Sequence, residues 1–261
     1  MIAAANIEKY EKSIEQGLDA LSKQEVIPRI WKRDWTVWKD DPKEIANRLG
    51  WLTSPQKMEE SLEGMSRFAA VCRSKGFSHA LLLGMGGSSL APLVLASVFK
   101  PGPGDLELDI LDSTDPAAVL HFRNKLDPKK TLYIVSSKSG TTAETKAFLN
   151  FFWNATAECL GAQRAGEHFA AITDPGTPLE DLARRLGFAF IFHGNPEIGG
   201  RFSALSPFGL VPAALTGTPL REIVRTARDM ATSCQSGSDP RRNPGAYLGT
   251  ILGVLNQKGL D

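Results

Sequence analysis

The sequence TLYIVSSKSGTTAETKAFLNFFW, residues 131–153, decides the fold of this chain. It begins with the apolar, β-branched run Thr131–Val135, which is typical of a buried strand in a parallel sheet. It ends with Lys146–Trp153, which has the pattern of a helix with one apolar side. The hydroxyl-rich segment Ser136–Thr145 therefore lies where a predicted strand ends and a predicted helix begins.

A strand-to-helix turn of this kind is a favourable place for an anion, because free backbone N–H groups and the positive end of the helix dipole meet there. The residues Ser136–Thr142 supply five hydroxyls, one ammonium and one glycine. An ordinary Ser/Thr helix cap needs only one hydroxyl. We interpret the turn as a phosphate site, and a plain helix cap is the alternative.

From His79 onward, strand-like runs alternate with helix-like runs. The predicted strands are His79–Leu83, Leu106–Leu111, Thr131–Val135, Phe169–Ile172 and Phe188–Phe192. The predicted helices between them are Leu90–Phe99, Pro116–Lys125, Thr142–Leu160 and Pro178–Leu186. This alternation predicts an α/β fold, a parallel sheet with helices on both faces. Ligands of such sheets bind outside the carboxyl ends of the strands.

Both ends of the chain have helical patterns. Those before the α/β part predict an N-terminal helical extension. The predicted helices are Ile7–Leu21, a short one from Pro42 through Leu49, one capped by Ser54 and running to about Lys75, and then Pro207–Leu215, Leu220–Cys234 and Pro244–Gln257. The break Ser236–Pro240 is typical of a hinge. We therefore expect an N-terminal helical region at 1–75, an α/β domain at 76–235 and a helical connection at 236–261.

Composition excludes several classes of partner. The chain of 261 residues has 30 Lys and Arg against 29 Asp and Glu, so its net charge is +1 and no basic field favours nucleic acid or an anionic membrane. No apolar run approaches the roughly 20 residues of a membrane span. Three widely spaced cysteines indicate reduced thiols in a cytoplasmic protein, and we expect Cys72 and Cys159 to be buried.

The first predicted strand ends in Gly84-Met85-Gly86-Gly87-Ser88-Ser89. Glycines let the backbone approach a ligand, and the following helix offers its N–H groups. The stretch lacks the Gly-Lys-Ser/Thr of a nucleotide P-loop. It is also a poor dinucleotide fingerprint, because Ser89 stands where the third glycine belongs. Contacts with sugar hydroxyls suit it better; a nicotinamide cofactor and a simple tight turn are the alternatives.

A third loop contains Gly199-Gly200-Arg201-Phe202-Ser203. The two glycines allow a sharp turn that aims the guanidinium of Arg201, whose forked donors suit an oxyanion or a phosphate. The alternative is a surface ion pair with Glu197. His193, which follows the last strand, is interpreted as a structural residue, although histidine is a common general acid and base, which leaves a catalytic role open.

Read together, the three loops resemble the phosphoglucose isomerase family. The matching pieces are Gly84–Pro92, Ser137–Thr145 and Gly199–Ser203, in this order and at strand ends. The stretch from Ile30 to Leu52 is similar to the isomerase part of bacterial fused transaldolase/phosphoglucose isomerase proteins. The resemblance covers nearly the whole chain.

The resemblance implies a sugar-isomerase domain with a flavodoxin-like three-layer sandwich. It implies interconversion of glucose 6-phosphate and fructose 6-phosphate through an enediolate, without metal or organic cofactor. The phosphate would be held by Ser137, Lys138, Ser139, Thr141 and Thr142. Gly87 and Ser88 would contact the sugar. Arg201, presented by Gly200, would stabilise the enediolate.

This sequence departs from the family pattern at Ser139-Gly140, where many members carry a threonine and an aromatic residue, and at Phe202, where a tyrosine is common. The family's glutamate base, ring-opening histidine and late lysine match no motif here. We therefore expect one half of an isomerase, which is inactive or incomplete when isolated. The expected partner is the missing C-terminal half, or another copy of the chain in a homo-oligomer. Glu144 and Glu197 are the acids nearest the mapped site, and neither is assigned as the base. A non-catalytic sugar-phosphate-sensing domain is the alternative function.

Overall fold

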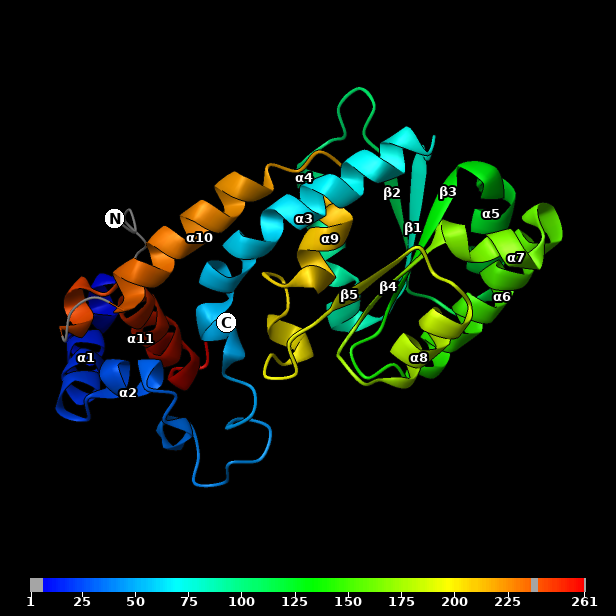
Figure 1. Ribbon diagram of the computed structural model, residues 1–261. Coiled ribbons are helices and arrows are strands. Elements are labelled where there is room, and N and C mark those ends of the chain that lie inside the picture. Colours follow the sequence, from blue (N-terminus) through cyan, green and yellow to red (C-terminus); the bar gives the residue numbers. More distant parts are fainter. Residues whose placement is uncertain (1–6, 236–238, 261) are drawn as a thin grey trace. The chain divides into compact units, whose positions relative to one another are not determined.

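A computed structural model describes residues 7–235 and 239–260. The chain divides into two compact units, Asn47–Val224 and the two ends of the chain together, Met1–Ala46 with Arg225–Asp261 (Figure 1). The domain boundaries expected at 75 and 235 stay predictions. Among the described residues, no helix combines the length and the apolar character that a membrane crossing requires.

The unit Asn47–Val224 is built on a five-stranded sheet in which every neighbouring pair is parallel. Its strands are β1 His79–Gly84, β2 Glu107–Leu111, β3 Thr131–Ser136, β4 Phe169–Thr173 and β5 Phe190–His193, in the order β2-β1-β3-β4-β5. This is a flavodoxin-like order, and the predicted fold class is confirmed. β5 begins later than predicted, because the amide of Phe188 still donates to Ala183 at the end of the preceding helix.

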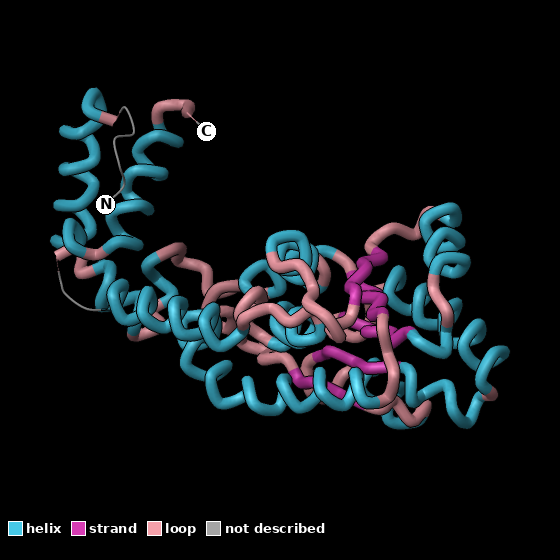
Figure 2. The backbone as a smooth tube through the Cα atoms, turned by 90° about the horizontal axis from the view of Figure 1, so that it is seen from above, coloured by secondary structure: helices cyan, strands magenta, loops and turns pink. Residues whose placement is uncertain are grey.

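Helices cover both faces of this sheet (Figures 1 and 2). Successive residues of a strand point to opposite faces, so Leu82 and Ile134 join one core while Leu81 and Val135 join the other. The first core includes α3 Ser54–Ser74, α9 Pro207–Leu215 and the start of α10 Leu220–Gln235, with α4 Leu90–Val98 beside it. The second includes α5 Pro116–Lys125, α6 Ala143–Leu160 and α8 Pro178–Arg185.

The second core is centred on stacked aromatic rings. The ring of Tyr133 on β3 lies 5.2 Å from that of Phe152 on α6 and 5.0 Å from that of Phe169 on β4. All three side chains are almost fully buried. Offset aromatic contacts add to the free energy gained by burying these side chains, so this cluster fixes α6 on the sheet.

The unit formed by the chain ends contains α1 Glu11–Lys23, α2 Val26–Trp31, the later part of α10 and α11 Pro244–Gln257. Ile14 and Leu18 of α1 share a small core with Ile251 and Val254 of α11. Arg241 donates to Glu15 at 2.9 Å and to Asp19 at 2.7 Å, which ties the two ends of the chain together.

Three details of the sequence interpretation are wrong. Pro42–Leu49 contains turns rather than a helix, because Glu44 has a left-handed backbone with φ 62° and Leu49 pairs with Ile198 in an antiparallel bridge. Ser54 is the first residue of α3, not its cap, and its buried Oγ has no partner among the described residues.

The third concerns Cys159, which is exposed, because it lies on the solvent side of α6; Cys72 is buried as predicted. The hinge predicted at Ser236–Pro240 lies partly outside the described residues, since residues 236–238 are not described.

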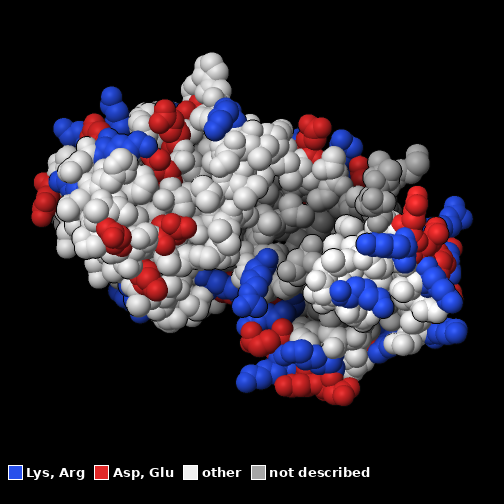
Figure 3. All heavy atoms as spheres, turned by 180° about the vertical axis from the view of Figure 1, so that it is seen from behind, with Lys and Arg blue, Asp and Glu red and all other residues white. Residues whose placement is uncertain are grey.

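On the face drawn in Figure 3, basic and acidic side chains are mixed and separated by uncharged areas. This agrees with the net charge of +1. A site for an anion on this protein must therefore depend on local groups rather than on a general positive field.

The substitution Phe152→Ala tests the aromatic core. Because this side chain is fully buried, we expect the free energy of unfolding to fall by about 3–5 kcal/mol. Urea unfolding followed by circular dichroism measures the change. Val98→Ala is the control, because Val98 is 65% exposed and should change stability by less than about 0.5 kcal/mol. A loss in Phe152→Ala as small as in the control would contradict this account of the core.

Candidate functional site

The candidate site lies where β1 and β3 end side by side. The chain leaves β1 towards β2 on one side and leaves β3 towards β4 on the other, and ligands of open α/β sheets bind at such a switch point. The glycine loop, residues 85–89, follows β1, and the hydroxyl loop, residues 137–142, follows β3. The arginine loop, residues 195–206, follows β5 at the same edge.

The glycine loop and the arginine loop touch through their backbones. A Cβ atom added to Gly87 would lie 2.2 Å from the carbonyl oxygen of Gly200. Ser203 stabilises the contact, because its Oγ lies 3.1 Å from the carbonyl oxygen of Gly87 and 2.7 Å from that of Gly200. The predicted residues Gly87 and Gly200 are therefore brought together, and only glycine at position 87 permits this approach.

The end of β3, directly before the hydroxyl loop, is tied to the glycine loop, and the hydroxyl loop is internally paired. Ser136 Oγ donates to the carbonyl of Ser88 at 3.2 Å. Within the loop, Ser137 and Thr142 share a hydrogen bond of 3.0 Å, and Ser139 and Thr141 share one of 2.8 Å. The four side-chain hydroxyls predicted to bind phosphate are thus arranged in two pairs at the start of α6.

Gly140 allows the hydroxyl loop to turn. Its φ is +66°, in the left-handed region, and an added Cβ would lie 2.8 Å from the backbone nitrogen of Leu179. A side chain here would have a strained backbone and would collide with the first turn of α8. This is the position at which the resemblance leads one to expect an aromatic residue.

Lys138 points along the sheet edge and joins the hydroxyl loop to two other strand ends. Its Nζ forms an ion pair with Asp174, directly after β4, and donates to the carbonyl of Asn195 at 3.1 Å. The other carboxylate oxygen of Asp174, Oδ1, is buried without a partner among the described residues. Sequence reasoning missed Asp174, although its place after a predicted strand was the available signal.

Arg201 has an exposed side chain that forms no hydrogen bond or ion pair with any residue in 7–235 or 239–260. The surface ion pair with Glu197 is therefore not formed. The next residue, Phe202, stacks on Trp51 with ring centroids 5.6 Å apart. Gly50 N donates to the carbonyl of Glu197 at 2.9 Å. Trp51 and Gly50 brace the arginine loop, a role that the sequence did not indicate.

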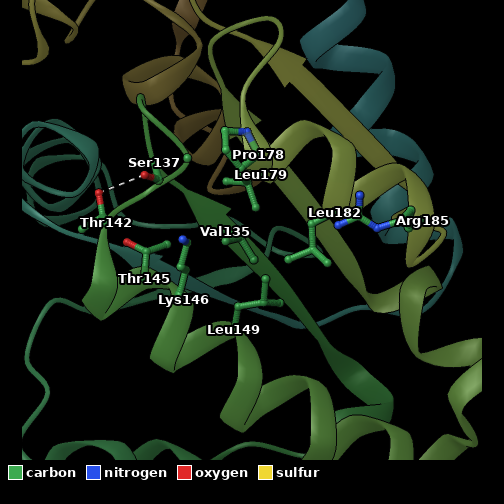
Figure 4. A pocket seen from close by; sticks show the side chains of 11 residues that line it. Val135, Ser137, Thr142, Thr145, Lys146, Leu149, Pro178, Leu179, Leu182 and Arg185 are labelled. Carbon is green, nitrogen blue, oxygen red and sulfur yellow. Dashed lines mark hydrogen bonds between the residues drawn. The ribbon is translucent and has the colours of Figure 1, made fainter.

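Five of the nine predicted site residues line two different cavities. Ser137 and Thr142 line a cavity of about 210 Å³ between α6 and α8 (Figure 4). Gly87, Gly200 and Arg201 line another of about 420 Å³ beside α4. The contacts from Ser136 to Ser88 and from Gly87 to Gly200 connect the two groups at the backbone, so the shared feature is an edge of three loops.

His193 has a structural partner, as the sequence suggested. Its Nε2 lies 2.9 Å from Glu180 Oε1. Glu180 also accepts from Arg184 at 2.6 Å and from the backbone of Gly176 at 2.7 Å. Arg184, then Gly176 and then His193 lower the pKa of Glu180 from 4.5 to about 2, since all three bonds favour the carboxylate.

The fold and the three loops define a class: a doubly wound α/β domain with an anion-compatible edge at its switch point. The phosphoglucose isomerase family model matches residues 55–244, and the chain belongs to this family. The chain is 34% identical over 230 residues to a glucose-6-phosphate isomerase of Carboxydothermus hydrogenoformans, covering 83% of this chain and 48% of that protein. It is 37% identical over 186 residues to one of Thermus thermophilus, covering 71% and 43%.

Two solved structures share the fold. A crystal structure of a hypothetical protein from Thermus thermophilus matches with a TM-score of 0.81 and 29% identity, covering 95% of this chain and 57% of that one. A glucose-6-phosphate isomerase from Chlamydia trachomatis matches with a TM-score of 0.66 and 28% identity, covering 89% and 42%. The chain thus spans about half the length of the curated relatives it matches.

The Glu180 cluster predicts how stability depends on pH. Because the pKa of Glu180 is lowered on folding, its stabilising contribution is complete above pH 4.5 and is lost as the pH falls towards about 2. Glu180→Gln removes the charge, so the variant should lose less stability over this range. Thermal unfolding at several pH values measures the slope. Glu158→Gln, on the exposed side of α6, is the control, and an unchanged slope in Glu180→Gln would refute the assignment.

Proposed function

We propose that this chain supplies the sugar-phosphate-binding half of a glucose-6-phosphate isomerase. The observation that carries the proposal is the place of the hydroxyl loop at the start of α6, directly after Ser136. The hydroxyl of Ser136 bonds to the glycine loop, which in turn touches the arginine loop. Family membership supports the reaction class, and the relatives named above are glucose-6-phosphate isomerases. The proposed ligands are glucose 6-phosphate and fructose 6-phosphate.

In this proposal Ser137, Lys138, Ser139, Thr141 and Thr142 hold the phosphate. The hydroxyls that now bond one another in pairs would turn their protons to the phosphate oxygens, because a hydroxyl rotor can choose its acceptor. Lys138 has three donor hydrogens, and Asp174 and Asn195 accept two of them, so one is left for the ligand. Each charge-assisted bond contributes about 1.5–3 kcal/mol.

The reacting end of the sugar is assigned to the other two loops. Gly87 and Ser88 would contact the sugar hydroxyls, and Arg201, presented by Gly200, would stabilise the negative charge of the enediolate. Arg201 suits this task because no described residue pairs with its guanidinium. A donor aimed at charge that develops in the transition state contributes on the order of 3 kcal/mol.

No described residue is assigned as the base. Glu144 lies in the first turn of α6, where the helix dipole favours a carboxylate. The backbone carbonyl of Glu197 accepts a hydrogen bond from Gly50 N. We infer that the groups that take the proton and open the ring come from the remaining length of the family's proteins. A transaldolase fusion and a cytoplasmic location belong to this proposal. Tight binding of sugar phosphate without turnover, even in the full-length protein, would favour the sensing function.

Binding of fructose 6-phosphate to the chain itself is the direct test. Isothermal titration at millimolar ligand should give measurable heat. Thr141→Ala should weaken binding about tenfold, because it removes a hydroxyl that donates a hydrogen bond to the charged phosphate. Ser97→Ala, which removes a hydroxyl that bonds only within α4, is the matched control. Absence of heat and of any thermal shift for the unmodified chain would refute the proposed function.

Arg201→Ala tests the division of roles. In a protein that contains both halves, turnover should fall about 100-fold or more, as for loss of one donor to developing charge. The affinity for inorganic phosphate should change little. Steady-state kinetics and phosphate inhibition measure the two effects. A larger loss of phosphate affinity than of turnover would make Arg201 part of the phosphate site instead.

A further inference from the structure

The cavity between α6 and α8 has features that the proposed reaction does not use. Two helix faces form its walls (Figure 4). Thr142, Lys146 and Leu149 are spaced by three or four residues and line it from the α6 side together with Thr145. Leu179, Leu182 and Arg185 line it from α8. Residues with this spacing share one face of a helix. Gly87, Gly200 and Arg201 are not among its lining residues.

The interior of this cavity is apolar and one wall lacks a side chain. Val135 of β3, Leu149 and Leu179 are all at most 4% exposed. Gly140 also lines it. The volume of about 210 Å³ is below the roughly 300 Å³ at which drug-sized ligands begin. The cavity therefore suits a compact apolar group.

Two cations border this apolar space. Lys146 approaches from α6 and Arg185 from α8, on different walls (Figure 4). Both are exposed, and neither forms a hydrogen bond or ion pair within the part of the chain that the structure describes. Beside Lys146, the hydroxyl of Thr145 is buried and has no partner among the described residues. Three donors thus lack acceptors around one cavity.

We propose that this cavity binds a small monocarboxylate with a compact apolar body. The carboxylate lies between Lys146 and Arg185, whose forked guanidinium matches its two oxygens. The apolar body covers Val135, Leu149, Leu179 and Leu182. Phosphate is disfavoured, because it has no apolar part to cover these walls and would have to give up more hydration than a monocarboxylate.

A ligand bound in this cavity would also affect the hydroxyl loop. Ser137 and Thr142 line the cavity and hydrogen-bond to each other, and both are assigned to the phosphate. A bound carboxylate would therefore change the affinity for sugar phosphate, and by linkage sugar phosphate would change the affinity for the carboxylate. This coupling rests on the proposed function, whereas binding of the carboxylate does not.

The test uses 4-fluorobenzoate as the probe and fluorine NMR of the whole chain as the readout. The probe should bind with millimolar affinity, and the neutral analogue 4-fluorobenzyl alcohol should bind more weakly. Lys146→Met and Arg185→Gln should each weaken 4-fluorobenzoate about three- to tenfold, as for a partly exposed charge-assisted contact. Because both side chains are exposed, these variants should fold normally.

Lys129→Met is the matched control, since Lys129 is exposed and does not line the cavity. Equal affinity for the acid and the alcohol, or equal losses in Lys146→Met and Lys129→Met, would overturn the proposal. Tighter binding of inorganic phosphate than of 4-fluorobenzoate, abolished by Lys146→Met, would also overturn it and make the cavity an oxyanion site. Sugar phosphate is absent from this experiment, so a negative result for the carboxylate leaves the proposed function intact.

Discussion

The contact between the backbones of Gly87 and Gly200 is the constraint on which the candidate site depends. With a Cβ at position 87 placed 2.2 Å from a carbonyl oxygen, the glycine loop and the arginine loop would have to separate. Ser203 holds the two carbonyl groups through one hydroxyl. Because Ser136 ties the glycine loop to β3 as well, the position of Arg201 is set by the sheet through two short contacts rather than by the flexibility of a surface loop.

Lys138 also connects loops at this sheet edge, through its charged ammonium group. Its ammonium joins the end of β3 to Asp174 after β4 and to Asn195 after β5. A partly buried ion pair is costly to break from one side, because the remaining charge stays uncompensated. Lys138 therefore has two tasks, one in holding the sheet edge together and one proposed for the phosphate. Thr141 and Arg201 are exposed, so substitutions there test ligand binding with less effect on the stability of the fold than a substitution of Lys138.

The strands and the helices between them were predictable because their patterns are local. Buried parallel strands have continuous apolar runs, and the predicted Pro116–Lys125 is found with the same bounds. The failures have nonlocal causes. Glu44 adopts a left-handed backbone in a segment where Leu49 pairs with Ile198, about 150 residues away. Cys159 lies in an apolar stretch yet is exposed, because composition does not define which side of α6 faces the sheet.

The sequence by itself determined the α/β class, the order of loops at one sheet edge and the family, because hydrophobic periodicity and short motifs are properties of contiguous residues. Only the tertiary structure decided which loops touch. The pairing of Lys138 with Asp174 and the stacking of Phe202 on Trp51 join residues far apart in the chain. The cavity bordered by Lys146 and Arg185 likewise exists only where α6 and α8 pack side by side, since neither helix alone can enclose a volume.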